Sequence, residues 1–488
     1  MKLKSIILLG TFASFSLSCS DFLEPEDNEY VKGDQLQETV DMNSDAIVQG
    51  VYSRSVQYGF GASRHDDFGQ RSIDISCDMM TEDVVHYTNK QWFVADYNLD
   101  NRAATYSRSL RQWKYCYAQI RDLNSIIDIY PNDNELNEEQ RHLKGESLAL
   151  RAFHYFTLVN IYQKAGKWAD VKDLPGVPVY TTVGLEGNPR GKVSDVYDQI
   201  KADYTNAIAL LEGDDYDKTR VGQLAAKALY ARAAMYYEDY ATAEKMASDV
   251  IAATSLMSTS DYTAGFADMA NIEWLWAVDV TSENTTSYAS FFSIMDNLSP
   301  GYAGSLGQYK CVDRRLYDAI DAKDIRKQCF KDGTYKIPYM QFKFVDPSKK
   351  FLGDLVYLRC AEAYYIKAEA QARQGNISGA QTTLNTISAA RSTDGECPYK
   401  WSANVDELIN QIFLHKRIEL WGEGQSLFEF NRLEKTIDRT YAGTNHPKGN
   451  ITAEGGDQPV PWSSKIRVIQ IPTKEIEGNP EISETDQN

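Results

Sequence analysis

Aromatic side chains are frequent in two long stretches of the chain that show little helical periodicity, residues 66–101 and 254–346. The flat face of an indole or a phenol covers the apolar face of a sugar ring, and burying roughly 100 Å² of apolar surface in this way stabilises binding by about 2.5 kcal/mol. Amides and charged groups beside such rings orient a ligand through its hydroxyls. The pattern predicts a ligand-binding surface with these candidate residues: Asn89, Trp92, Tyr97, Tyr288, Phe292, Tyr302 and Tyr309.

The same rings have a second interpretation, which is packing in the interior of the loops. Trp274 and Trp276 share one face of an expected short strand at Glu273–Val280, and this alternation favours the core for both. Tyr155 and Phe156 lie on an expected helix and are interpreted as core residues for the same reason. The loop aromatics are therefore candidates for binding, and the aromatics of regular elements are candidates for stability.

A pair of carboxylates could also carry chemistry. Glu419 and Glu423 are four residues apart on one expected helical face, and paired carboxylates are the groups that hydrolyse glycosidic bonds. The surrounding pattern favours a structural role, with Arg417 and Arg432 as the expected charge partners. The chain contains no Walker loop, no G-x-G-x-x-G and no G-x-S-x-G elbow. No catalytic residue is predicted.

Metal and nucleic-acid chemistry are both disfavoured. The six histidines are scattered and none forms an H-E-x-x-H motif, so no transition-metal site is predicted. Asp66, Asp67 and Asp313 could ligate a structural calcium ion, but a solvated acidic loop is the favoured interpretation and no cofactor is predicted. The formal net charge of −18 repels a phosphate backbone, which argues against nucleic acid as a partner.

The N-terminus has the composition of a targeting segment. Two lysines precede a short apolar run, and residues 1–18 are predicted to be a lipoprotein signal peptide, too short to span a membrane. Small residues around Cys19 predict cleavage before it and acylation of its thiol; an ordinary signal with a chance cysteine is the alternative. Residues 19–35 are acidic and are predicted to be a flexible leader between anchor and fold.

Helical periodicity dominates the rest of the chain. Apolar residues recur at steps of three and four from Gly145 to Tyr162 and again from Leu355 to Arg373, where Gly375 is expected to end the helix. Several segments match the tetratricopeptide pattern of paired helices with small crossing residues. We predict a mainly α domain over 36–488, in which loop insertions near 66–101 and 254–346 interrupt an array of such units; the units lie near 113–162, 196–250 and 355–391.

Seven sequence segments together resemble the SusD/RagB family of Bacteroidetes nutrient-uptake lipoproteins, and they occur in the family's order. Each segment alone is weak, but the set is specific. The segments are Cys19–Glu24, Trp113–Ile127, Gly145–Phe156, Leu174–Pro178, Tyr357–Ala370, His415–Arg432 and Ile471–Pro480.

The resemblance implies a SusD-like fold, with tetratricopeptide-like helices as a scaffold and long loops as the binding half. It implies a lipid-anchored protein on the outer-membrane surface that binds a glycan without cleaving it. It also implies a partner, a SusC-like TonB-dependent transporter. Two alternatives remain open from the residues themselves: a peptide- or protein-binding helical scaffold, and a helical glycoside hydrolase.

Overall fold

The computed structural model describes residues 33–61, 64–213, 217–286, 288–451 and 456–488. The predicted signal peptide, Cys19 and most of the predicted leader lie outside these residues. The first helix, α1, begins at Gly33, so it includes the last three residues of the range predicted as leader. None of the described helices combines the length and apolarity needed to cross a membrane.

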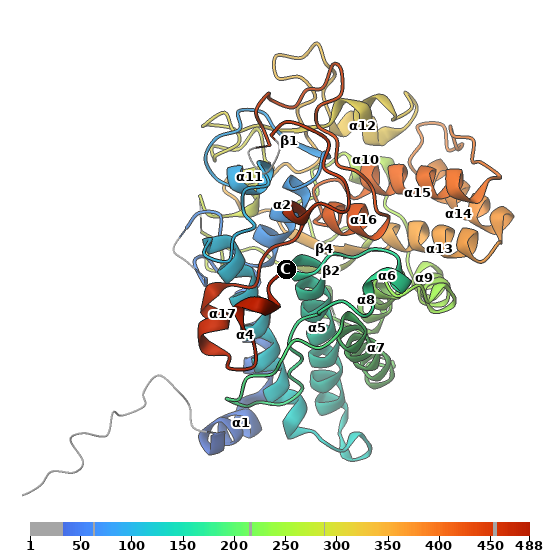
Figure 1. Cartoon of the computed structure of the whole chain (residues 1–488). Coiled ribbons are helices and arrows are strands. Elements are labelled where there is room, and N and C mark those ends of the chain that lie inside the picture. The colour runs from blue at the N-terminus through green and yellow to red at the C-terminus, as the bar shows by residue number, and fades with distance from the viewer. Residues whose placement is uncertain (1–32, 62–63, 214–216, 287, 452–455) are drawn as a thin grey trace, which may run out of the picture.

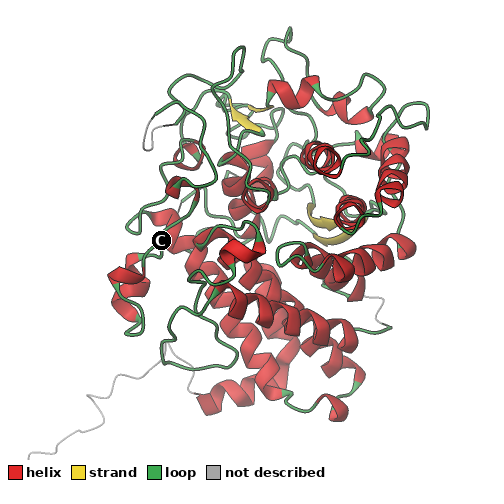
Figure 2. Cartoon of the chain, turned by 45° about the vertical axis from the view of Figure 1, so that its right-hand side comes forward, coloured by secondary structure: helices red, strands yellow, loops and turns green. Residues whose placement is uncertain are grey.

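Most of the regular secondary structure is helical, as the sequence predicts, and the longer helices make an array in which successive helices pack together, except that the last two both pack on the third from the end (Figures 1 and 2). The array explains why small and apolar residues recur at helical spacing, because successive helix backbones approach closely. Its members are α1 (Gly33–Arg54), α4 (Ser107–Ile129), α5 (Glu138–Tyr162), α7 (Val193–Leu210), α8 (Gln223–Ala234), α9 (Tyr240–Ala253), α13 (Ala361–Arg373), α14 (Ile377–Ala390) and α15 (Val405–Glu419).

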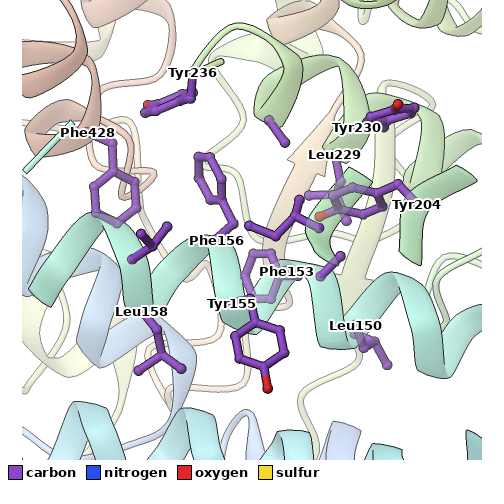
Figure 3. Packing of buried hydrophobic residues seen from close by; sticks show 14 of the residues in the cluster. Leu150, Phe153, Tyr155, Phe156, Leu158, Tyr204, Leu229, Tyr230, Tyr236 and Phe428 are labelled. Atoms are coloured by element: carbon purple, nitrogen blue, oxygen red, sulfur yellow. The ribbon is translucent and has the colours of Figure 1, made fainter. Parts of the chain in front are cut away.

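The core of the array is built around α5. This helix starts at a capping box, in which the side chain of Asn137 accepts from the N–H of Gln140 and that of Gln140 accepts from the N–H of Asn137. Every residue from His142 to Tyr162 is buried. The ring of Phe156 packs against those of Tyr236, just after α8, and Phe428 on α16 (Ser426–Arg432) (Figure 3). The ring of Phe153 lies 5.3 Å from that of Trp276, so α5 is also covered on that side.

The α13–α14 pair shows which boundary the sequence predicts and which it misses. Gly375 adopts a positive φ of 83° and ends α13, and Asn376 caps α14 by accepting from the N–H of Gly379. The predicted start at Leu355 is wrong, because residues Leu355–Arg359 form strand β4. Antiparallel pairing with β2 (Trp274–Val278) overrides the helical period there.

The strand predicted at Glu273–Val280 is confirmed as β2, and both of its tryptophans are buried. They belong to different hydrophobic clusters. Trp276 packs with the helical array, and Trp274 packs with the part of the fold built mainly from the two loop insertions, which we call the loop half. The register of β2 against β4 shifts between the two tryptophans. Strand β2 therefore lies at the junction of the scaffold and the loops.

The loop half contains short elements held together by a second strand pair. Strand β1 (Val84–His86) pairs antiparallel with β3 (Lys310–Val312), which joins the two predicted loop insertions side by side.

The remaining helices, from all parts of the chain, are short. They are α2 (Gln70–Met79), α3 (Val94–Tyr97), α6 (Trp168–Val171), α10 (Thr259–Tyr262), α11 (Phe291–Met295), α12 (Arg314–Asp318) and α17 (Thr473–Gly478), with 3-10 turns η2 (Asp133–Glu135), η3 (Ile325–Cys329), η4 (Lys465–Arg467) and η5 (Glu484–Asp486).

Candidate functional site

Three of the predicted binding residues, Trp92, Tyr288 and Tyr302, meet in one group of rings in the loop half. In the chain they flank β1 and α11, which are labelled in Figure 1. Trp92 and Tyr302 are edge to face with ring centres 6.0 Å apart, and Tyr288 lies 5.8 Å from Tyr302. Three further rings complete the group through contacts of 5.3 to 6.1 Å. We call the group the site cluster; it consists of Tyr58, His65, Trp92, Tyr288, Tyr302 and Phe351.

The site cluster presents part of its ring surface to solvent. Tyr288 is 47% exposed, and Tyr58, His65 and Trp92 are half-buried. Tyr302 is nearly buried, with its hydroxyl in a short hydrogen bond to Nδ1 of His65. Such an arrangement offers partly exposed aromatic side chains that are held in place by contacts with one another.

The segment that carries Trp92 contains polar atoms without a partner. Nε1 of Trp92 and Oδ1 of Asn89 are buried and have no hydrogen-bond partner among the described atoms. Asn89 is held by a backbone with a positive φ of 45°. An indole N–H and an amide oxygen are a donor and an acceptor suited to hydroxyl groups. Trp92 and Asn89 thus combine an apolar face with hydrogen-bonding capacity.

A buried guanidinium fixes the two segments that carry His65 and Trp92. Arg108, on α4, donates to Asp66 at 2.9 Å and to Asp96 at 2.6 Å. Burial alone would raise the pKa of Asp66, but Arg108 and Arg111 lower it well below its usual range. The charged carboxylate therefore keeps its bonds, and the scaffold helix α4 positions the loops of the site cluster.

Other predicted binding residues are placed differently. Tyr97 is fully buried, with its hydroxyl 2.6 Å from Nδ1 of His446, and Phe292 is 1% exposed in the hydrophobic core. Neither side chain is available to a ligand in this structure, because a tertiary core closes over them. Tyr309 is half-buried and forms a separate pair with Tyr87, with ring centres 6.2 Å apart.

Sequence reasoning missed Tyr58, His65 and Phe351 as members of the cluster. Tyr58 lies outside both predicted insertions, just after α1, and Phe351 lies just past the second one. His65, which directly precedes the first insertion, is one of the six scattered histidines. No local signal marks these residues, since their role depends on contacts between segments far apart in the chain.

The surface also has hollows away from the site cluster, but the aromatic side chains that line two of them are almost fully buried. Two of them, of about 350 and 400 Å³, are each lined in part by Ile272 and Trp274. Trp274 is 2% exposed, and Phe266, which lines the first, is 4% exposed. The site cluster is therefore the better candidate for stacking on a sugar.

The carboxylate pair Glu419 and Glu423 is structural, as the sequence favours, but its partners differ from those predicted. Glu419 is fully buried and pairs with Arg359 at 2.6 Å and with Arg391 at 3.0 Å. Burial would raise the pKa of Glu419, but Arg391 and Arg359 lower it well below its usual range. A carboxyl buried among arginines, with its pKa held this low, is not suited to donate a proton to a glycosidic oxygen.

The surrounding ion pairs form what we call the charge network, which joins β2, β4, η3 and the ends of α14 and α15. It comprises Glu273, Arg326, Lys343, Arg359, Arg391, Glu419 and Glu423. The predicted partners are used elsewhere: Arg417 pairs with Glu82 and Asp83, and Arg432 pairs with Glu369 and Glu429.

The acidic residues considered for calcium have protein partners. Asp66 binds arginines, and Asp313 caps α12 and accepts from the hydroxyl of Tyr441 at 3.0 Å. Over the described ranges, no group of three or more His, Cys, Asp or Glu side chains is arranged to hold a metal ion.

Two family models match the sequence. The first, described as starch-binding associating with outer membrane, matches residues 21–237, and the second, described as the SusD family, matches residues 323–488. The two ranges together span most of the chain. The chain belongs to the SusD family. No curated protein sequence matches it.

Solved structures show the same fold. A SusD-like carbohydrate binding protein from Bacteroides vulgatus has a TM-score of 0.79 at 24% identity, covering 91% of this chain and 97% of its own. A SusD superfamily protein from Bacteroides thetaiotaomicron has a TM-score of 0.75 at 21% identity, covering 92% and 99%. One from Bacteroides fragilis has a TM-score of 0.70 at 21% identity, covering 90% and 98%. At these identities the likeness establishes the SusD fold of this chain.

Proposed function

We propose that this SusD family member binds an oligosaccharide or polysaccharide at the site cluster without cleaving it. The observation that carries the proposal is the meeting of Trp92, Tyr288 and Tyr302 from distant segments on one partly exposed surface. Two or three rings along such a surface give micromolar to millimolar affinity once the cost of association is included. The printed description of the B. vulgatus relative as carbohydrate binding supports the same reading.

The protein would then deliver its ligand to a SusC-like TonB-dependent transporter while anchored to the outer-membrane surface through acylated Cys19. The family description that mentions the outer membrane supports this location. A tethered binder raises the local ligand concentration at a transport pore, so that even a weak site can feed uptake. Incorporation of radiolabelled palmitate that disappears in Cys19→Ala would test the anchor, and co-purification with a TonB-dependent barrel would test the partner.

Affinity electrophoresis tests the binding itself. Purified mature protein should be retarded in native gels that contain one of a panel of polysaccharides, and the retardation should be lost in Trp92→Ala. The same panel should show no release of reducing ends. Binding to peptides with no retardation by any glycan would favour the helical-scaffold alternative, and release of reducing ends would favour a hydrolase.

A further inference from the structure

One charged side chain lies directly against the rings of the site cluster. The guanidinium carbon of Arg64 is 5.6 Å from the ring centre of Trp92, and the side chain is 43% exposed. Among the described residues, no other cation lies over a ring of the cluster. A guanidinium stacked on an indole is held in place at little entropic cost, which prepares it to meet a ligand.

Arg64 is only weakly engaged by its own chain. Its Nε atom lies 3.4 Å from Oδ1 of Asp66 without forming a hydrogen bond to it, and its terminal nitrogens form no hydrogen bond to another described atom. Asp66 already receives Arg108 at 2.9 Å and Arg111 at 2.8 Å. One buried carboxylate thus faces three guanidinium groups, and Arg64 is the most exposed of the three.

We propose that the site cluster takes an anionic glycan, in which Arg64 pairs with a uronate carboxylate or a sulfate ester while Trp92 stacks on the sugar ring. The proposal rests on the proposed function of the site cluster and names the class of glycan. The planar fork of arginine matches the oxygens of both kinds of anion through two parallel hydrogen bonds. The Arg64 side chain is 43% exposed and donates no hydrogen bond to another described residue, which suits it to such a pair.

The charge of the whole protein makes this local cation informative. With a net charge of −18, the protein repels polyanions at long range, so selective capture of an anionic glycan requires a dedicated group at the site. Added salt should then have two opposite effects on the affinity for an anionic glycan. It screens the long-range repulsion, which favours binding, and it weakens the contact with Arg64, which disfavours binding. Removal of the Arg64 side chain should leave the repulsion between the protein and the polyanion unchanged but remove the local attraction that offsets it.

The test compares Arg64→Gln with Lys90→Gln, which removes the same charge from an exposed lysine two residues before Trp92. Affinities are measured by isothermal titration for a polyuronate, a sulfated galactan and a neutral galactan, with melting temperatures recorded in parallel. The wild type should prefer a charged polymer at least tenfold, and Arg64→Gln should lose about tenfold on that polymer alone. Lys90→Gln should bind like the wild type. The arm that responds, polyuronate or sulfated galactan, identifies the anion.

Each other result would contradict the inference. A wild type that binds the neutral polymer as tightly as the charged ones, with Arg64→Gln unchanged, refutes the anionic preference but leaves glycan binding by the site cluster intact. Equal losses on all three polymers in Arg64→Gln would give Arg64 a structural role only. If no polymer of a broad panel bound, and Trp92→Ala made no difference, the proposed function itself would fall and the inference with it.

Discussion

The site cluster and the charge network use the same kinds of residue in opposite ways. In the charge network, Arg359 is fully buried and meets Glu273, Glu419 and Glu423 at 2.6 to 2.8 Å. Beside the site cluster, Arg64 is 43% exposed and its nearest carboxylate is shared with two other arginines. The first arrangement satisfies its charges within the chain and stabilises the junction of scaffold and loops. The second leaves charges and ring faces available, which is what a binding surface requires.

Glu419→Gln should give the largest effect, because it leaves Arg326, Arg359 and Arg391 buried with too little negative charge. Breaking a buried ion pair by removing one partner costs about 3–5 kcal/mol. We expect the free energy of unfolding to fall by that order in chemical denaturation. Glu139→Gln makes the same change at an exposed site on α5 and should alter stability by less than about 0.5 kcal/mol. Equal stabilities of the two variants would show that the network contributes little.

Trp92→Ala should act on binding rather than on stability. Loss of the buried part of an aromatic face weakens binding by about 1.5–3 kcal/mol, roughly a tenfold to hundredfold loss of affinity. Trp462→Ala is the matched control, since Trp462 is also half-buried and lies under a cation, Lys164, at 4.1 Å. Trp462 differs in that its Nε1 donates to the carbonyl of Ala165. Both variants are measured by affinity gels and thermal melts; unchanged retardation for Trp92→Ala would remove it from the site.

The charge network should also make stability depend on pH. Burial, with Arg326 beside it, lowers the pKa of His415 to about 3, while Asp324 and Glu419 oppose this shift. The folded state therefore excludes a proton that the unfolded chain binds below about pH 6.5. Above about pH 6.5 His415 is neutral in both states and does not destabilise the fold. As the pH falls from about 6.5 toward 3, the free energy of unfolding decreases by up to about 1.4 kcal/mol per pH unit, because only the unfolded chain binds the proton.

Denaturation of wild type and His415→Gln at several pH values isolates this component. The wild type should lose its advantage over the variant as the pH falls from about 7.5 to about 5, the range just around the unfolded pKa. A difference between the two proteins that does not change with pH would mean that His415 is protonated in the folded state, or that the substitution acts through packing alone.

The helical scaffold could be predicted from the sequence because its signals are local. The existence of α5 and the end of α13 at Gly375 follow from residues a few positions apart, whereas the burial of α5 on all sides depends on its tertiary partners. The start of α13 could not, since Leu355–Arg359 become a strand only through pairing with β2. Local period competes with tertiary pairing there, and the pairing wins.

The site was predictable only in composition. The sequence indicates which loops carry rings, but His65 and Tyr302 are 237 residues apart and meet through the β1–β3 pairing of the two insertions. Tyr97 and Phe292 were mispredicted for the same reason. Both are aromatic residues of the loop insertions, but tertiary contacts that the sequence does not show bury them in the core. The partners of Glu419 were mispredicted for this reason too, because Arg326, Arg359 and Arg391 come from three separate elements.

Tyr309→Ala should give the smallest effect and therefore marks the edge of the site. Tyr309 contacts Tyr87 and has no ring contact with the site cluster among the described residues. If binding is confined to the site cluster, this variant should keep its affinity within about twofold, an effect below 0.5 kcal/mol. A loss as large as that of Trp92→Ala, measured in the same affinity gels and with an unchanged melting temperature, would extend the binding surface across β1 and β3. The ligand would then contact both ring groups, and the short strand pair between them would form part of its binding surface.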